Sequence, residues 1–486
     1  MIYDLLLRSA SRFAERPALV EAGKTFTYGE VKELAGAAER YLADRTMGSA
    51  GTVALQLPNS IEYAVVIFAL ASRRVRMLLL DPALKAGEAE SYCQRAGAGM
   101  LMGPPGQACG TKTPPRLNVP SVAALLAALA QTPLPADSQP AFGRSDADLF
   151  LFLSTGTSGT PKIVRRTGAQ IAAAVEAFNA AFNYSERDKV LVSLPFSHSF
   201  GLINALVSPL ASGASVHISP FAPRRTAELI ERDRITVFPA TPFMFRMLVE
   251  TDMARAPDFS SLRLAVATGS PLAPAVGRKF REKFGVSIVQ AYGATETGPV
   301  AFGLPTELGD AAGCVGRPYA GVSVEVRDSS GRAVAPGAEG EICVRSPACS
   351  GGYLDDAKAN AATFMGGYVR TGDVGRLDAS GHLFVLGRNK PMLNVEGKKV
   401  SPAEVEACLR SHPAVADVLV VGLTAAEGGE RIHAFVVPAA PVTALELQAF
   451  CGQRLADFKV PRQVVLVASL SSGPMGKPRG SAPEPM

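Results

Sequence analysis

A long alternation of short apolar runs with amphipathic segments restricts the fold of this chain more than any other feature. Between residues 149 and 291, runs of four or five mostly apolar residues are each followed by a longer segment with apolar side chains at helical spacing. This pattern predicts parallel strands joined by helices, because a parallel pair needs a long crossover connection. The predicted strands are residues 149–153, 190–194, 215–219, 236–239, 264–267 and 287–291, and the predicted helices are residues 169–182, 202–210, 226–232, 242–250 and 274–284.

The region before this alternation continues the pattern. Residues 18–28 predict a short hairpin with a turn at Gly23, while residues 52–57 and 76–80 predict strands on either side of a helix at 61–72. Strands separated by a buried helix again favour a layered sheet with helices packed on its faces. We therefore expect an α/β fold with doubly wound subdomains.

The character of the sequence changes in its last third. From Gly321 onward, short strands alternate with glycine turns, which predicts a β-rich subdomain. After Lys390, two helical patterns and two strand patterns predict a small α+β domain. We place a large N-terminal domain at residues 1–387, a hinge at 388–390 and a C-terminal domain at 391–486.

Composition narrows the class of protein. A chain of 486 residues allows two to four domains at roughly 150 residues each. The net charge is only +5 and no run of five basic residues occurs, so nucleic-acid binding is not expected. The seven cysteines are odd in number and form no C-x-x-C pair, which argues against zinc sites and disulfides. Without a signal peptide or a run of about 20 apolar residues, we expect a cytoplasmic protein with no membrane span.

Directly after the predicted strand at 149–153 comes STGTSGTPK, residues 154–162, which contains two glycines, five hydroxyl side chains and one lysine. Small residues let backbone N–H groups approach an anion, hydroxyls add donors, and lysine adds charge. This favours a phosphate-binding loop over a flexible surface loop with a chance lysine. The predicted phosphate-binding residues of the loop are Ser154, Thr155, Gly156, Thr157, Ser158, Gly159 and Lys162.

Two common meanings of such a stretch are disfavoured. A Walker loop needs glycine before the lysine and serine or threonine after it, whereas Pro161 and Ile163 flank Lys162. A hydrolase elbow needs G-x-S-x-G, and around Ser158 the last position is Thr160.

The stretch at 154–162 and the motifs that follow it resemble, in the same order, those of the adenylate-forming superfamily. That superfamily includes acyl- and aryl-CoA ligases, luciferases and peptide-synthetase adenylation domains. The resemblance covers essentially the whole chain, and it implies an N-terminal AMP-binding domain followed by a mobile C-terminal domain. The further motifs are PFSHSFGL (195–202), ATGSPL (267–272), QAYGATETG (290–298), GEICVRS (340–346), YVRTGD (368–373), GRNKPMLNVEGKKVSPAEVE (387–406), FKVPR (458–462) and GPMGK (473–477).

By this resemblance, the middle motifs hold the nucleotide. Tyr292 offers an aromatic face to adenine, and its neighbour Gly293 suggests a loop setting rather than a core. Glu296 would hold Mg2+ against the phosphates through hard oxygen coordination, and Asp373 would accept both ribose hydroxyls. Each also has an ordinary structural explanation: a core tyrosine, a solvated charge and a turn-forming residue. The set further includes Gln290, Ala291, Thr295, whose hydroxyl would reach the α-phosphate, and Arg388, which would reach ribose or phosphate oxygens.

The resemblance also assigns a catalytic lysine and a pivot. Lys477 would lie between the substrate carboxylate and the α-phosphate, where it holds two repelling anions in line. On its own, a lysine in a Gly/Pro-rich tail would be read as solvated. Lys390 stands where the superfamily has its hinge residue.

The acid site is less clearly marked. His198 is expected to act as a gate in catalysis, although a histidine between serines is more often a surface residue. Peptide-synthetase adenylation domains place an Asp in the comparable stretch to bind the substrate ammonium, whereas the run 196–199 holds no acid. By this resemblance an ammonium group would lack a partner, and the substrate is expected to be a carboxylic acid without an α-amino group. The expected pocket residues are Phe200, Asn204, Phe238, Met244, Gly269 and Ser270, and they do not separate aryl from alkyl acids.

The expected function is that of an AMP-forming acid–thiol ligase of the acyl-CoA synthetase type, with ATP, Mg2+ and CoA. A carrier-protein phosphopantetheine is the rival acceptor, because Asn394 stands where acyl-CoA ligases commonly carry lysine. Gly397 is retained, and a glycine there lets a thin pantetheine arm pass close to the backbone. A nucleotide-binding pseudoenzyme and a simple ATPase are the rivals from other classes. The chain is expected to be a monomer or a homodimer.

Overall fold

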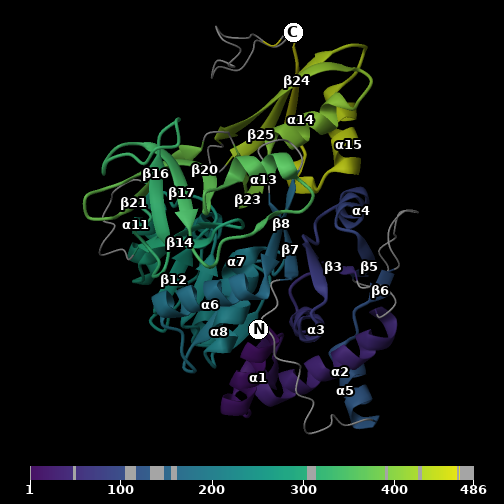
Figure 1. Cartoon of the computed structure of the whole chain (residues 1–486), viewed down its shortest axis with the longest axis vertical. Coiled ribbons are helices and arrows are strands. Elements are labelled where there is room, and N and C mark those ends of the chain that lie inside the picture. Colours follow the sequence, from purple (N-terminus) through teal and green to yellow (C-terminus); the bar gives the residue numbers. More distant parts are fainter. Residues whose placement is uncertain are drawn as a thin grey trace. The chain divides into compact units, whose positions relative to one another are not determined.

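The computed structural model divides the chain into two compact units. The first contains Met1–Pro82, Cys93–Leu153 and Ile163–Gly387, and the second contains Ala83–Tyr92, Ser154–Lys162 and Arg388–Met486. Many elements of both units are labelled in Figure 1. The residues that the structure describes are 2–46, 51–103, 116–131, 147–154, 161–303, 313–388, 392–424, 430–467 and 470.

The first unit is built on a nine-stranded sheet with the order β15-β14-β13-β12-β11-β9-β10-β1-β2. Its central strands pair in parallel in the order β10, β9, β11, β12 and β13. This confirms the alternation of strands and helices predicted from the sequence. The strands are β1 (Pro17–Glu21), β2 (Lys24–Thr27), β9 (Lys189–Val192), β10 (Ser215–Ile218), β11 (Val237–Ala240), β12 (Leu264–Ala267), β13 (Ile288–Ala294), β14 (Gly298–Gly303) and β15 (Arg317–Pro318).

Alternate side chains of these strands enter two separate cores. In β12, Val266 joins the core that also contains Phe178 of α6, while Ala265 and Ala267 join a core with Phe245 of α10. A strand with both faces buried can be apolar throughout, which explains the uninterrupted apolar runs in the sequence. Helices α6 and α8 cover one face of the sheet (Figure 1). The helices beside this sheet are α6 (Gly168–Phe182), α7 (Ser199–Leu202), the π-helix η1 (Ile203–Val207), α8 (Ser208–Ala211), α9 (Pro223–Arg232), α10 (Pro242–Glu250) and α11 (Pro274–Phe284).

The first unit also contains a seven-stranded sheet, β18-β8-β7-β4-β3-β5-β6, and a five-stranded sheet, β16-β17-β20-β19 with β21 on β20. The five-stranded sheet is the β-rich subdomain predicted from its glycine turns. Its strands are β16 (Ser323–Arg327), β17 (Gly340–Arg345), β19 (Phe364–Met365), β20 (Tyr368–Leu377) and β21 (Leu383–Arg388). The seven-stranded sheet contains β3 (Thr52–Gln56), β4 (Arg76–Leu80), β5 (Ala98–Gly103), β6 (Arg116–Asn118), β7 (Asp148–Ser154), β8 (Lys162–Thr167) and β18 (Gly352–Tyr353), with α1 (Ile2–Phe13), α2 (Tyr28–Thr46), α3 (Ile61–Ser72), α5 (Val122–Gln131) and α13 (Ala357–Thr363) completing the unit.

The second unit has its own small core, formed where α14 and α15 pack on a three-stranded sheet, β24-β25-β26. Its most buried charge is Lys459, whose Nζ lies 2.7 Å from carboxylate oxygens of both Glu88 and Glu404. Although burial lowers it, these carboxylates hold the pKa of Lys459 above its ordinary value. The elements are α4 (Ala86–Arg95, which belongs to this unit as far as Tyr92), β22 (Leu393–Val395), β23 (Lys398–Val400), α14 (Pro402–Arg410), β24 (Val415–Thr424), β25 (Glu430–Pro438), α15 (Ala444–Arg454), the short 3-10 helix η2 (Asp457–Lys459) and β26 (Gln463–Leu466).

Candidate active site

The motif at 290–298, expected to bind adenine and a metal ion, forms a hairpin at one end of the nine-stranded sheet. Strand β13 extends to Ala294 and pairs antiparallel with β14, so Gly293 lies in a strand rather than in the expected loop. A glycine is required there because a Cβ at position 293 would lie 2.4 Å from the carbonyl oxygen of Gly298. A β-bulge between Tyr292 and Gly293 shifts the register at this point, a feature common beside active sites.

Two predicted nucleotide residues from distant motifs touch each other. The phenol of Tyr292, on β13, donates a hydrogen bond of 2.6 Å to Oδ2 of Asp373, on β20. Asp373 is almost fully buried, and its backbone N–H donates to the hydroxyl of Thr371 at 3.1 Å. The structure therefore brings together the residue expected to stack on adenine and the residue expected to hold the ribose.

Glu296 is held in place by two residues that the sequence reasoning did not single out. The phenol of Tyr353 donates to Glu296 Oε1 at 3.0 Å, and the backbone N–H of Ser350 donates to the Glu296 carbonyl at 2.7 Å. Burial, reinforced by the Glu296 carboxylate, raises the pKa of Tyr353 well above its usual value, so the phenol keeps its proton. Among the described residues, none donates a hydrogen bond to the second carboxylate oxygen, Oε2.

A fully buried arginine lies behind the same turn. Arg166, on β8, has no exposed surface, and its Nη1 donates to the carbonyl of Thr295 at 2.8 Å. Within the described part of the chain, its Nε and Nη2 atoms have no hydrogen-bond partner. Burial lowers the pKa of Arg166 to about 10, while Cys349 and Glu296 counteract that effect, so the guanidinium is charged at neutral pH.

The loop that carries His198 is fixed by another residue missed in the sequence. The carboxamide of Asn59 donates to the carbonyl of Leu194 at 2.7 Å and accepts from the backbone N–H of Phe196 at 2.8 Å. His198 is more than half exposed, and its Nε2 lies 3.7 Å from Oδ2 of Asp81, which follows β4. The ring is thus accessible and faces a carboxylate, as a gate or a proton carrier requires.

The six residues predicted to line the acid pocket do not all gather in one place. Phe200 packs edge-on against Phe178 at 5.5 Å in the core beneath α6, and Asn204 lies in the adjoining π-helix. Phe238 lies in the opposite core, 5.7 Å from Phe245, because its position in β11 points to the other face of the sheet. Met244 packs against that second core, and Gly269, with φ +89°, and Ser270 form the turn after β12.

Asn204 shows the clearest signs of a functional position within this set. It is fully buried in a π-helical turn, and such turns are frequent at functional sites. Its Oδ1 accepts from the phenol of Tyr184 at 3.3 Å, while its Nδ2 has no partner among the described residues. This side chain can therefore still donate two hydrogen bonds.

Several of the predicted phosphate and lysine positions lie outside the described residues. Ser154 ends β7 and Lys162 begins β8, and both belong to the second unit, as does Arg388 at the end of β21. The rest of the phosphate loop (Thr155, Gly156, Thr157, Ser158 and Gly159), the pivot Lys390 and the catalytic candidate Lys477 fall among the residues not described.

In the second unit, the predicted acceptor channel is a tight hairpin turn. Glu396 and Gly397, with φ angles of +52° and +84°, connect β22 to β23. The backbone N–H of Asn394 donates to Glu430 Oε2 at 2.6 Å, and among the described residues its Oδ1 has no hydrogen-bond partner. Positive φ at both turn residues is typical of a type I′ hairpin and explains the glycine there.

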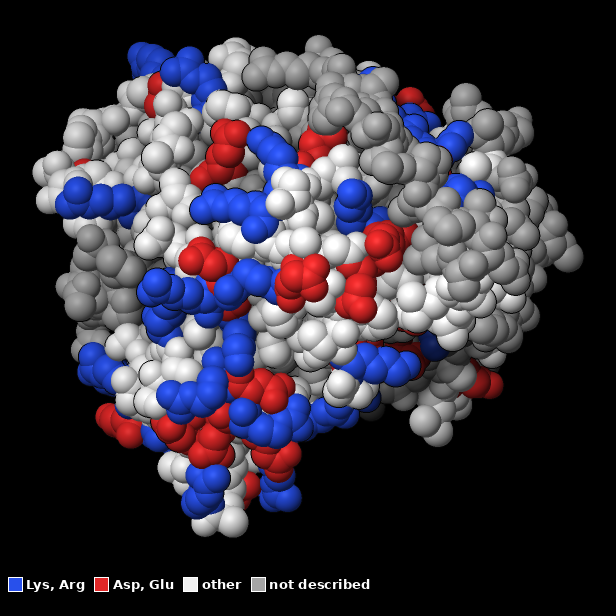
Figure 2. Space-filling model, turned by 90° about the horizontal axis from the view of Figure 1, so that it is seen from below, with Lys and Arg blue, Asp and Glu red and all other residues white. Residues whose placement is uncertain are grey.

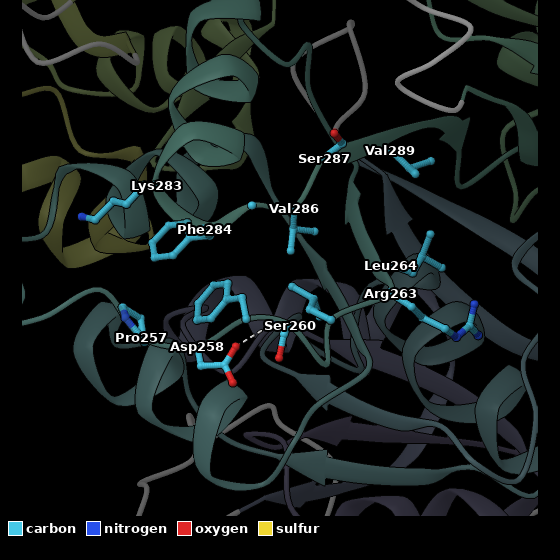
Figure 3. Close-up of a pocket in the computed structure, with 13 residues that line it drawn as sticks. Pro257, Asp258, Ser260, Arg263, Leu264, Lys283, Phe284, Val286, Ser287 and Val289 are labelled. Carbon is cyan, nitrogen blue, oxygen red and sulfur yellow. Dashed lines mark hydrogen bonds between the residues drawn. The ribbon is translucent and has the colours of Figure 1, made fainter.

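A cavity of about 570 Å3 lies apart from these residues, at the amino ends of β12 and β13. Figure 3 shows it between a segment that includes Asp258 and Ser260 and a segment that includes Phe284 and Val286. Ligands of open α/β sheets bind at the carboxyl ends of the strands, where Gly269 lies. This cavity is therefore not the nucleotide site.

The described residues show neither a surface patch of one charge in the view of Figure 2 nor a cluster of metal-binding side chains. On the face drawn in Figure 2, lysine and arginine side chains are interspersed with aspartate and glutamate. No cluster of three or more His, Cys, Asp or Glu side chains suited to a metal occurs among the described residues. The same residues include no helix with the length and apolar character that crossing a bilayer requires.

The fold and the paired motifs define an adenylate-forming enzyme, and the chain belongs to the AMP-binding enzyme family. The AMP-binding enzyme family matches residues 6–354, and the AMP-binding enzyme C-terminal domain matches residues 404–477. The resemblance and the fold class inferred from the sequence are thereby confirmed.

Individual relatives cover nearly the whole chain. The probable CoA ligase CCL9 of Humulus lupulus is 32% identical over 97% of this chain and 94% of its own length. The fatty acid–[acyl-carrier-protein] ligase ScoC of Streptomyces coeruleorubidus is 30% identical over 95% of this chain and 91% of its own. The structure of o-succinylbenzoate CoA synthetase (MenE) from Bacillus subtilis, a double mutant bound with its product analogue OSB-NCoA, matches with a TM-score of 0.88. It is 28% identical and covers 98% of this chain and 97% of that one.

Proposed function

We propose that this protein is an ATP-dependent acid–CoA ligase that forms an acyl-adenylate, releases pyrophosphate and then transfers the acyl group to a thiol. The observation that carries the proposal is the 2.6 Å contact between Tyr292 and Asp373. It joins the tyrosine proposed to stack on adenine, at the end of β13 beside the turn that carries Glu296, to the carboxylate on β20 that is proposed to bind the ribose. CoA ligases among the relatives support CoA as the acceptor.

In the first half-reaction, an oxygen of the substrate carboxylate attacks the α-phosphorus of ATP. The bond from the α-phosphorus to the bridging oxygen breaks, and pyrophosphate leaves with the bond electrons. Tyr292 and Asp373 hold the nucleoside, and the hydroxyl of Thr295 donates a hydrogen bond to an oxygen of the α-phosphate. Lys477 holds the two anions in line and stabilises the charge that grows during attack.

The carboxylate of Glu296 suits a magnesium ion that enters the site with ATP. Mg2+ is usually held by one or two carboxylates together with substrate phosphates and water, and Glu296 keeps Oε2 open among the described residues. When bound, the ion would neutralise charge on the phosphates and on the departing pyrophosphate. Glu296 is the side chain that would hold it.

In the second half-reaction, the thiol sulfur attacks the acyl carbonyl carbon, and the bond from that carbon to the AMP oxygen breaks. The thiol proton passes to solvent, and AMP leaves. We propose that the C-terminal domain turns about Lys390 between the two steps and that the pantetheine arm passes Gly397. ATP and CoA are cytoplasmic metabolites, so we place the protein in the cytoplasm.

The test is acid-dependent ATP–pyrophosphate exchange over a panel of aryl and alkyl carboxylates. We expect exchange with at least one acid, and a loss of at least about a hundredfold in Lys477→Ala, as expected for a charge aligned in the transition state. Lys459→Ala is an unsuitable control because Lys459 is buried between two carboxylates. Exposed Lys358→Ala is suitable and should exchange normally. Absence of exchange with every acid would overturn the proposal, and ADP in place of AMP would identify a simple ATPase.

A carrier protein is the second candidate acceptor. ScoC is such a ligase by name, and Asn394 removes the lysine that acyl-CoA ligases commonly have in this segment. Adding CoA or a holo-carrier protein to enzyme loaded with acyl-adenylate separates the two. Thioester on CoA supports the main proposal, and thioester on the carrier alone supports the second.

A further inference from the structure

The turn that carries Glu296 is fixed from several directions. The guanidinium of Arg166 donates a hydrogen bond of 2.8 Å to the carbonyl of Thr295, and the backbone N–H of Ser350 donates one of 2.7 Å to the carbonyl of Glu296. Tyr353 bonds the carboxylate itself at 3.0 Å. The contact at Thr295 involves a fully buried cation, and the one at the carboxylate a largely buried phenol.

A buried guanidinium with a single neutral partner needs an explanation. Taking a cation out of water costs several kcal/mol unless charge and hydrogen bonds compensate, yet Nε and Nη2 of Arg166 have no partner in the described part of the chain. Gly298 follows the turn with φ +70°, and a Cβ there would lie 3.4 Å from Nη2 of Arg166. The main chain of the turn therefore passes close to the guanidinium on both sides of Glu296, at Thr295 and at Gly298.

We propose that Arg166 and Tyr353 are positioning residues that hold Glu296 in the arrangement needed to bind Mg2+ with ATP, and that they serve the adenylation half-reaction alone. The inference rests on the proposed function, because only that step involves a metal-bound pyrophosphate. Arg166 fixes the backbone of the turn and Tyr353 fixes the carboxylate through Oε1, so Oε2 is left to bind the metal ion. Residues that orient a metal-binding side chain typically change metal affinity or activity by about 10- to 100-fold when replaced.

The variants are Arg166→Gln, Arg166→Lys and Tyr353→Phe, with Arg165→Gln as the matched control. Arg165 is the neighbouring residue on β8, is partly exposed, and its Nη1 lies 3.8 Å from Asp148. Arg166→Lys retains the charge and can recover part of the bond to the Thr295 carbonyl. Tyr353→Phe removes one hydroxyl and keeps the ring that packs on Phe364 at 5.3 Å.

Metal binding is measured first, without turnover. Mn2+ is titrated by electron paramagnetic resonance in the presence of α,β-methylene-ATP. We expect Arg166→Gln and Tyr353→Phe to weaken Mn2+ binding by about 10- to 100-fold, Arg166→Lys by less, and Arg165→Gln not at all. Unchanged Mn2+ affinity in both Arg166→Gln and Tyr353→Phe would overturn the inference.

The two half-reactions are measured next. Pyrophosphate exchange in these variants should need more Mg2+ for half-saturation, with the KM for the acid unchanged. Thioester formation from supplied acyl-adenylate in EDTA should proceed at the wild-type rate. Equal losses in both half-reactions would reveal a merely structural role and overturn the inference. If Arg166→Gln does not fold, Tyr353→Phe decides the question alone.

The outcomes also keep this inference separate from the proposed function. If the wild-type protein exchanges pyrophosphate with no acid, the ligase proposal fails, but the Mn2+ titration with the ATP analogue still tests Arg166 and Tyr353. If the wild-type protein exchanges normally and the variants bind Mn2+ as tightly as it does, only the positioning roles are refuted.

Discussion

At the residue scale, the contact between Tyr292 and Asp373 separates two contributions to ATP binding. Tyr292→Phe keeps the ring and loses the 2.6 Å bond to the carboxylate, so we expect the KM for ATP to rise about three- to tenfold. Tyr292→Ala also loses a stacking surface that is worth roughly 1–3 kcal/mol, so its KM should rise at least about tenfold further. Pyrophosphate exchange at varied ATP measures both. Equal effects of the two variants would show that the ring does not contact adenine.

For a second tyrosine, Tyr319, we expect removal of the hydroxyl to be favourable rather than harmful. Burial raises the pKa of Tyr319 well above its usual value, and its hydroxyl has no hydrogen-bond partner among the described residues. Leaving a buried hydroxyl unpaired costs about 1–3 kcal/mol, so Tyr319→Phe should stabilise the protein by about 1 kcal/mol. Urea denaturation checks this. A clear loss of stability would mean that the hydroxyl has a bonding partner in solution.

The sequence could predict the site residues that stand in motifs, but not those whose role depends on their neighbours in space. Tyr292, Glu296 and Asp373 stand in recognisable motifs, and two of them proved to be in contact. Arg166 and Tyr353 were missed because their role depends on the spatial neighbourhood of Glu296, more than 50 residues away in each case. One signal was available for Arg166: it follows the apolar pair Ile163 and Val164, in a segment where we predict no strand, and arginine is almost never fully buried unless it is paired.

At the element scale, one carboxylate ties together the starts of three parallel strands. Asp188, just before β9, accepts from Thr236, just before β11, at 2.7 Å and from Arg263, just before β12, at 2.8 and 2.9 Å. The alternation of strands and helices was visible in the sequence. This cross-strand anchor was not, because the three residues are separated by whole helices.

We expect Asp188→Asn to destabilise the protein by about 3 kcal/mol at pH 7, because it leaves Arg263 without its charge partner. Burial alone would raise the pKa of Asp188, but hydrogen bonds from Arg263 and Thr236 outweigh that effect and hold the pKa below its ordinary value. The stabilisation is therefore present above the unfolded pKa, near 4, and is lost as pH falls through the lower folded pKa. Urea denaturation at pH 7 and below pH 4 should show the wild-type advantage shrinking. Asp258→Asn, at an exposed pair with Arg234, is the control, and an advantage that persists at low pH would contradict this account.

At the scale of the whole molecule, the two half-reactions should respond to different substitutions. Asn394 lies in the second unit, in the hairpin whose glycine is proposed to admit the pantetheine arm. Asn394→Lys adds a charge-assisted donor there, so CoA thioester formation should rise by up to about tenfold while pyrophosphate exchange stays unchanged. Asn394→Gln is the uncharged control. If Asn394→Lys alters exchange instead, the division of labour between the units is wrong.

The whole-molecule organisation was the part most open to prediction, since it follows from pattern and length. The described structure has the large α/β portion, the β-rich sheet and a small α+β unit, as expected. The acid pocket was less predictable. Phe238 and Phe200 both look like pocket aromatics in the sequence, and only strand alternation, which sends β11 side chains to two faces, shows that they lie in different cores.

That division into two cores bears on how new substrate preferences can arise. Phe200 and Asn204 belong to one core, while Phe238 and Phe245 belong to the other. Substitutions without shared neighbours usually add independently in their effect on stability. Under the proposed assignment of Phe200 and Asn204 to the acid pocket, a library restricted to these two positions would vary the acid while the core around Phe238 and Phe245 keeps its packing. On that assignment, the side chains that select the acid and the aromatic side chains that hold the opposite core together can change independently.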